Sequence, residues 1–312
     1  MRKKALIFLK RAAVVVFVGV VTALVVSKAR DMDWREVLQA LQAYDVATLA
    51  GAFAVALPAY LACASFDLIG RHATGHRLPA ARTALISFTG YFFSLNLGAL
   101  VGGLAFRYRL YMPYGLSGMT ISQIIGLSVV TNWSGYVLIA GAVMAWEPPE
   151  LPPGWDVSAS LLRGIGIFLL LLAAGYIAIS AVKGGSSVLL KGSRFAIPTI
   201  GITAIQIGLS MVSWGGIGAV ITWLLNGDVS WFAVMPVLMM SAIAGIWSHI
   251  PSGLGVTEVV FLSLLGHVVP ESRLLAAVLA FRIVYYIVPF VVAALAYFYL
   301  EATAKGERAR ER

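Results

Sequence analysis

The feature that most constrains this chain is a series of apolar runs, each about as long as a membrane-spanning helix. A span needs about 20 mostly apolar residues to cross the hydrocarbon layer. Full spans are expected at residues 11–27, 47–68, 121–146, 161–182, 196–225 and 274–300. No stretch between them is polar enough for a soluble domain, so the sequence predicts an all-α polytopic membrane protein with about six full spans.

Composition supports this interpretation. Hydrophobic residues make up 60% of the chain and charged residues 12%, whereas a soluble protein is about 25% charged. The net charge of +9 could indicate nucleic acid, but the cations cluster at the ends of apolar runs, as in loops that face anionic lipid. We therefore exclude nucleic acid as a partner. A signal peptide is the alternative for residues 1–27, but without a convincing cleavage site we expect an uncleaved anchor.

Charge also predicts the orientation. If the N-terminus is cytoplasmic, most of the 23 Lys and Arg residues fall on the cytoplasmic side and most of the 14 acids on the other. This satisfies the positive-inside rule and places both termini in the cytoplasm, in a multi-pass protein of the cytoplasmic (inner) membrane. Residues 28–44 mix apolar and charged positions as an amphipathic helix on the membrane surface does.

Two segments broken by glycine or proline are expected to turn back instead of crossing. Residues 84–110 would enter from the inside and 231–269 from the outside, as re-entrant helical hairpins. They lie in two repeats of opposite orientation, 47–146 and 196–300, an arrangement typical of alternating-access transporters. Two full spans in each segment, joined by loose loops, are the alternative. The remaining regions are the N-terminal span with its surface helix (1–46), the linking span (147–195) and the basic cytoplasmic tail (301–312).

Ionisable residues inside apolar runs are costly and usually functional. Arg282 lies within the last span, and Glu258 begins a helix after a Pro-Ser-Gly-Leu-Gly turn. We expect these two to pair, and Arg107 to face the same internal cavity. The alternatives are a first-turn acid that complements the helix dipole, for Glu258, and cations that extend to the interface, for Arg107 and Arg109.

The glycines beside these charges suggest a binding site. They permit tight turns and close backbone approach, a helix that starts after such a turn attracts anions, and arginine matches phosphate oxygens. Packing between helices is the alternative role for the glycines. The predicted substrate-binding residues are Asn96, Gly102, Gly103, Arg107, Arg109, His249, Pro251, Ser252, Gly253, Gly255, Glu258 and Arg282.

Signals of enzymatic chemistry are weak. The sequence has no phosphate-binding loop and no His-Glu-x-x-His motif, and Cys63 is its only cysteine. His249 has Ser248 and Ser252 nearby but no recognisable catalytic arrangement. We expect no enzymatic activity, catalytic residue, metal or cofactor.

Several runs carry a resemblance to a known family. They are Asp33-Trp-Arg-Glu-Val, Leu100-Val-Gly-Gly-Leu-Ala-Phe-Arg-Tyr-Arg-Leu-Tyr, Thr131-Asn-Trp-Ser-Gly-Tyr, Ile243-Ala-Gly-Ile-Trp-Ser-His-Ile-Pro-Ser-Gly-Leu-Gly-Val-Thr-Glu and Phe281-Arg-Ile-Val-Tyr-Tyr. The chain resembles the YbhN-like inner-membrane proteins of the lysylphosphatidylglycerol synthase transmembrane-region superfamily. Its best understood members look like flippase domains for aminoacylated phosphatidylglycerol, so the resemblance implies lipid translocation. It also implies roles for Gly102, Gly103, Arg107, Pro251, Gly253, Gly255, Glu258 and Arg282.

Two departures limit what the resemblance implies. Leu104 stands where many members of the superfamily have an acid, and the chain ends at Arg312, without an aminoacyl-transferase domain. We therefore expect no lysyl-lipid synthesis. The expected function is a phospholipid flippase or transporter for an anionic glycerophospholipid, with membrane phospholipid as its partner. The alternative is a non-catalytic scaffold for a lipid-modifying enzyme, and a homodimer stays open.

Overall fold

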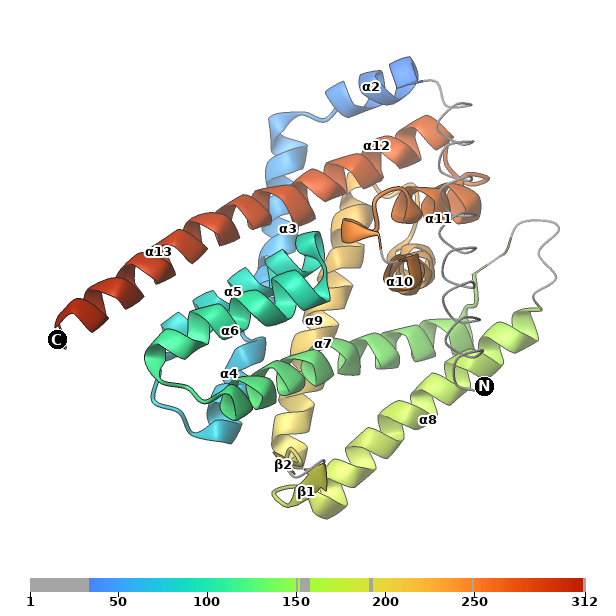
Figure 1. The fold of residues 1–312 in the computed structure, drawn as a ribbon. Helices are drawn as coiled ribbons and strands as arrows, with labels where there is room; N and C mark the ends of the chain where they lie inside the picture. Colours follow the sequence, from blue (N-terminus) through green and yellow to red (C-terminus); the bar gives the residue numbers. More distant parts are fainter. Residues whose placement is uncertain (1–33, 150, 152–157, 191–192, 249, 311–312) are drawn as a thin grey trace, which may run out of the picture.

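A computed structural model describes residues 34–149, 151, 158–190, 193–248 and 250–310. The chain is mostly helical, and its long helices cross one another at a range of angles (Figure 1). The expected first span and His249 lie outside the described residues. The prediction of an all-α polytopic membrane protein is confirmed.

Six described helical segments are long and apolar enough to cross a membrane: Val46–Thr74, Gly118–Trp146, Ala159–Lys183, Ile200–Leu224, Trp231–Ser248 and Glu271–Ala304. Five match predicted spans. The other, Trp231–Ser248, was expected as one arm of a hairpin. The elements that make up these segments are α3 (Val46–Ala64), α4 (Phe66–Thr74), α7 (Gly118–Trp146), α8 (Ala159–Lys183), α9 (Ile200–Leu224), α10 (Trp231–Ser248), α12 (Glu271–Arg282), the π-helix η4 (Ile283–Ile287) and α13 (Val288–Arg310).

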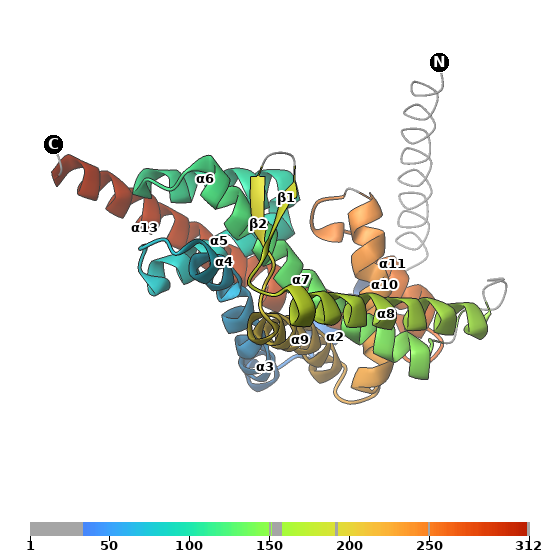
Figure 2. The same cartoon turned by 90° about the horizontal axis from the view of Figure 1, so that it is seen from below.

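The core forms where α3, α7 and α9 pack together. Small residues on α3 allow close approach: Ala59 is fully buried, and a Cβ on Gly216 of α9 would lie 2.9 Å from its Cβ. Small residues that let helices approach closely are enriched where helices pack in lipid. The outer helix α8, which packs on α7 (Figure 2), keeps large apolar side chains such as Phe168 and Leu171 exposed, as a lipid-facing helix does.

The predicted amphipathic helix is present from Trp34 onward. Helix α2 (Trp34–Gln42) buries Val37 and packs against α12, beside which it lies in Figure 1. Trp34 and Leu38 stay exposed. Its position on a membrane surface remains a prediction.

Residues 80–111 form a helical hairpin at the place where the first one was predicted. Helix α5 (Ala80–Leu97) ends at Gly98, whose φ is +88°, and the chain returns through the π-helix η1 (Ala99–Ala105) and α6 (Phe106–Tyr111). A short 3-10 turn, η2 (Met112–Tyr114), leads on to α7. A Cβ on Gly102 would collide with the carbonyl group of Phe93, so the two arms touch backbone to backbone. That contact favours the packing role for this glycine.

The second predicted hairpin also turns back on itself. Helix α10 leads into the 3-10 turn η3 (Pro251–Gly253) and then α11 (Val256–Leu265), which packs against α10. Ser252, Gly253 and Gly255 all have positive φ values, 59°, 56° and 79°, which make the turn sharp. Whether either hairpin is re-entrant, and whether the two repeats are inverted, remain predictions.

The basic loop before α9 departs from a purely helical chain. Strands β1 (Ser187–Leu190) and β2 (Ser193–Ala196) pair antiparallel, with Ser187 opposite Ala196. The predicted all-α fold did not include these strands. The paired segment is short and lies at the end of α8, away from both hairpins (Figure 1).

Candidate functional site

The turns of the two hairpins touch. The hydroxyl of Ser252 donates to the backbone carbonyl oxygen of Asn96 at 3.3 Å, and the Asn96 side-chain amide donates to the carbonyl oxygen of Tyr286 at 3.4 Å. The end of α5 therefore contacts both the second turn and the π-helix η4. The turns of the two hairpins therefore lie close together.

The predicted ion pair between Arg282 and Glu258 is present and forms a fork. Nε of Arg282 bonds to Oε1 of Glu258, and Nη2 bonds to Oε2 at 2.9 Å. Both residues are buried, with 6% and 9% of their surfaces exposed. Bidentate, charge-assisted bonds of this type are among the strongest in proteins.

Arg282 also closes the second turn. Its Nη1 donates to the carbonyl oxygen of Ser252 and its Nη2 to that of Gly253, each at 2.9 Å. These carbonyl groups lie in a sharp turn with positive φ, where no regular helix supplies donors. The guanidinium also lies over the ring of Tyr286, 5.2 Å from its centroid. One side chain therefore joins α12, the turn η3 and the start of α11.

Arg107 does not share this cluster, so the expectation of one cavity for all three charges is wrong. Its Nε donates to Asp67 Oδ2 at 3.1 Å, and Tyr111 donates to the same oxygen at 2.9 Å. Its Nη2 donates to the hydroxyl of Ser128 at 3.3 Å and to the carbonyl oxygen of Ser87 at 3.5 Å. These partners belong to α4, α5, α6 and α7, and none of them to the second hairpin. The first hairpin therefore carries a buried ion pair of its own.

Asp67, the partner of Arg107, is not among the predicted site residues. Asp67 is fully buried. Arg107 could have pointed to it, because a buried arginine needs a carboxylate partner inside the protein. Gly90 was also missed: a Cβ there would lie 2.7 Å from Nε of Arg107, so this glycine makes the space that the guanidinium occupies.

The remaining predicted residues are distributed as follows. Arg109 pairs with Glu301 of α13 at 2.6 Å and its side chain is 63% exposed, which agrees with the alternative of a surface cation. Gly103 packs against Ser94 of α5. Pro251 and Gly255 belong to the second turn. Within the described ranges no group of three or more His, Cys, Asp or Glu residues could hold a metal ion.

Comparison with known proteins identifies the family of this chain. Residues 11–293 match the family described as the lysylphosphatidylglycerol synthase TM region. The chain belongs to this family. The matched range contains both hairpins and both buried ion pairs.

Three relatives extend this result. The inner membrane protein YbhN of Escherichia coli is 39% identical over 94% of this chain and 92% of its own. An uncharacterized protein of Synechocystis, slr0712, is 31% identical over 84% and 82% of the two chains. A phosphatidylglycerol lysyltransferase of Staphylococcus haemolyticus is 24% identical over 90% of this chain but only 32% of its own. These relatives support a multi-pass protein of the inner membrane with a role related to membrane lipid.

Proposed function

We propose that the protein moves an anionic glycerophospholipid across the cytoplasmic membrane. The observation that carries this proposal is the contact between the two hairpin turns, Asn96 with Ser252, directly beside the buried Arg282. Broken helices that meet inside a transporter are where substrates bind and where access alternates.

The bonds that hold the turn η3 against Arg282 suggest how the site would bind a lipid. The fork with Glu258 and the two turn carbonyls occupy the guanidinium of Arg282. A lipid phosphate can bind there only when the turn moves away and gives up these bonds. An anionic headgroup would then replace the acceptors that the arginine loses, which compensates part of the cost of opening.

The family supports lipid as the substrate class. One relative is named for an enzyme that acts on phosphatidylglycerol, and this chain matches about a third of that protein. An anionic headgroup can replace the carboxylate that a buried arginine gives up, whereas a zwitterionic headgroup brings a second cation to the same place. We propose no enzymatic activity for the part of the protein described here, and we propose both termini on the cytoplasmic side.

Leaflet exchange in liposomes tests the proposal. Purified protein should accelerate the movement of labelled phosphatidylglycerol between leaflets, as followed by a reductant that cannot cross the membrane. The variant that replaces both Glu258 and Arg282 with methionine should remain folded and lose this activity. Arg109→Ala removes a surface cation and should keep it.

The second candidate is a membrane scaffold for a lipid-modifying enzyme, favoured by the match to the membrane region of a lysyltransferase. Folded wild-type protein that accelerates exchange of no anionic phospholipid would refute the flippase and favour the scaffold. Cross-linking in native membranes would then identify the enzyme, and it would also show whether the chain forms homodimers.

A further inference from the structure

The cluster around Asp67 contains a polar atom without a partner. Asp67 is fully buried, and its Oδ2 accepts from Arg107 and Tyr111. Its Oδ1 is inaccessible to solvent and has no hydrogen-bond partner among the described residues. A buried acceptor without a donor costs about 1–3 kcal/mol, and more when it is charged. The carboxylate therefore has an open binding position inside the protein.

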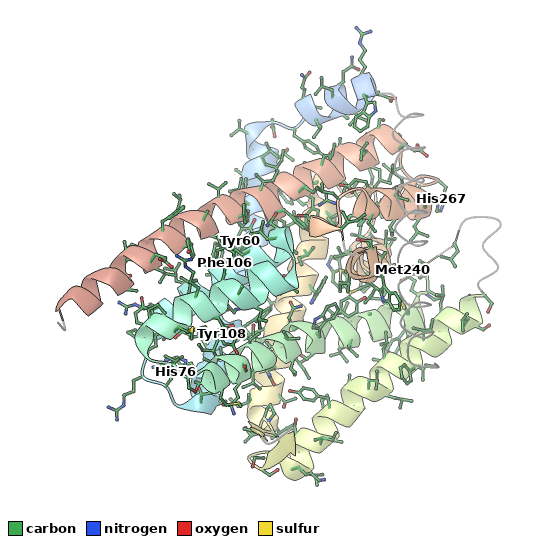
Figure 3. All side chains as sticks on the ribbon, viewed as in Figure 1. Tyr60, His76, Phe106, Tyr108, Met240 and His267 are labelled. Carbon is green, nitrogen blue, oxygen red and sulfur yellow. The ribbon has the colours of Figure 1, made fainter. Side chains whose placement is uncertain are left out.

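A donor without a partner belongs to the same cluster. His76 lies in the loop between α4 and α5, at the end of the molecule where Tyr108 is also found (Figure 3). Its Nδ1 accepts the N–H of Leu78 at 3.3 Å, which leaves the proton of the neutral ring on Nε2. Nε2 is buried and has no partner in the described chain.

Tyr111 connects the histidine to the carboxylate. The rings of His76 and Tyr111 meet edge to face, with centroids 6.2 Å apart. The hydroxyl of the same tyrosine donates to Asp67 at 2.9 Å. A buried N–H donor and a buried carboxylate oxygen, both unpartnered, therefore flank one side chain.

We propose that Oδ1 of Asp67 is a binding site for a proton, which arrives through His76, and that this proton releases Arg107 for an anionic ligand. A hydronium ion protonates Nδ1 of the imidazole, which gives up its bond from Leu78 N–H. The imidazolium passes its Nε2 proton to Oδ1 through water, since the two atoms are not bonded to each other. The ring regains its first tautomer when Nδ1 releases its proton to water and Nε2 takes one up. The histidine ends neutral and the aspartate becomes a carboxylic acid. The Arg282–Glu258 fork offers no such position, because both oxygens of Glu258 are bonded.

The surrounding charges suit proton exchange at His76. Burial first, and then the cation of Arg71, lower the pKa of His76, while Asp67 opposes the shift. The histidine is therefore mostly neutral at neutral pH and passes on a proton readily. The surrounding elements carry five cations: Arg71 of α4, Arg77 beside His76, Arg82 of α5, and Arg107 and Arg109 of α6. Helix α4 also carries His72, and α5 carries Tyr91.

The other helices packed on α4 add little charge. Helices α3, α7 and α9 contribute no Asp, Glu, Lys, Arg or His. Their titratable side chains are Tyr60, Cys63 and Tyr136. Asp67 is therefore the one acid that these surroundings, within the described ranges, place against Arg107.

Release of Arg107 is feasible because it already has other acceptors. The hydroxyl of Ser128 and the carbonyl oxygen of Ser87 hold its Nη2 when the carboxylate is neutralised. The added positive charge then favours an anion, and one phosphate monoanion restores the net charge of the ion pair. This last step rests on the proposed function, so a proton and an anionic headgroup would bind together. The proton site itself does not depend on transport.

Infrared difference spectroscopy tests the proton site without any transport. Wild-type protein in nanodiscs of phosphatidylcholine is stepped from about pH 8 to about pH 5, the range in which histidine exchanges protons. The wild type should show one carboxylic acid band that is missing from the spectrum of Asp67→Asn and present in that of Asp228→Asn, which removes an acid from a surface pair with Arg273. Identical spectra of the wild type and Asp67→Asn in the carboxylic acid region would overturn the proposal.

Two further measurements test the relay through His76 and the release of Arg107 separately. In His76→Gln the band should form more slowly after a pH jump but reach the same height, and an unchanged rate would refute the relay. In nanodiscs with phosphatidylglycerol the Asp67 band should be stronger at a given pH than in phosphatidylcholine, because the released Arg107 binds the anionic headgroup, and an unchanged band would refute the release of Arg107. An Asp67 band without leaflet exchange refutes only the flippase, and exchange without that band refutes only the proton site.

Discussion

The two buried ion pairs of this protein are built differently. In the Arg282–Glu258 pair both carboxylate oxygens are bonded, and the guanidinium also binds two turn carbonyls at 2.9 Å. In the Arg107–Asp67 pair one oxygen accepts two bonds, the other accepts none, and the bonds made by Arg107 run from 3.1 to 3.5 Å. The first pair is suited to hold a turn closed, and the second to change its state.

The largest expected effect on stability is at the Arg282–Glu258 pair, in which both carboxylate oxygens are bonded. Glu258→Gln leaves Arg282 buried without a countercharge, which should lower the free energy of unfolding by about 3–5 kcal/mol. Denaturant unfolding in detergent measures this loss. Replacing both residues with methionine should recover most of the stability, because two apolar side chains leave no unpaired charge. If the double variant were as unstable as Glu258→Gln, the unpaired charge of Arg282 would not be the cause of the loss.

A smaller loss of stability is expected at the Arg107–Asp67 pair. Asp67→Asn also leaves a buried arginine without a countercharge, but it keeps an acceptor for Arg107 and Tyr111 and removes the unpartnered charged oxygen, so the cost should be smaller, about 1–3 kcal/mol. The same unfolding measurement applies. If Asp67→Asn were the more damaging of the two single substitutions, the contrast between the ion pairs would be wrong.

The space around Arg107 offers a more local perturbation. Gly90→Ala places a methyl group against Cγ and Nε of Arg107, and overpacking of this kind costs about 1 kcal/mol or somewhat more. We expect a small loss of stability together with a shifted carboxylic acid band of Asp67. Gly164→Ala on α8 is the matched control, since its methyl group meets open space. Equal behaviour of the two variants would show that Gly90 does not position the arginine.

The smallest effect is expected on the surface. Arg109→Ala removes an exposed pair with Glu301, and solvent screening leaves such pairs with little influence on folding. Unfolding and leaflet exchange should both match the wild type. A clear loss of exchange with normal unfolding would place Arg109 in the substrate path after all.

The sequence predicted the fold well because membrane spans depend on long apolar runs, which can be read one segment at a time. The pairing of Glu258 with Arg282 was also predictable, since two charges in adjacent apolar helices have few alternatives. The partner of Arg107 was missed because the pairing depends on how α4, α5 and α6 pack together. A local sequence pattern does not predict such packing. The π-helices η1 and η4, next to the two arginines, likewise had no sequence signal that we recognised.

Covalent closure of the hairpin contact tests the central claim most directly. Asn96→Cys and Ser252→Cys, introduced after Cys63→Ala, place two thiols where the turns touch. A short thiol-reactive cross-linker should stop leaflet exchange of phosphatidylglycerol in the double-cysteine variant, cleavage of the linker should restore it, and the cross-linker should not change the exchange rate of either single-cysteine variant. Full exchange with the turns cross-linked would contradict the account, because the lipid would then pass without separation of the hairpins.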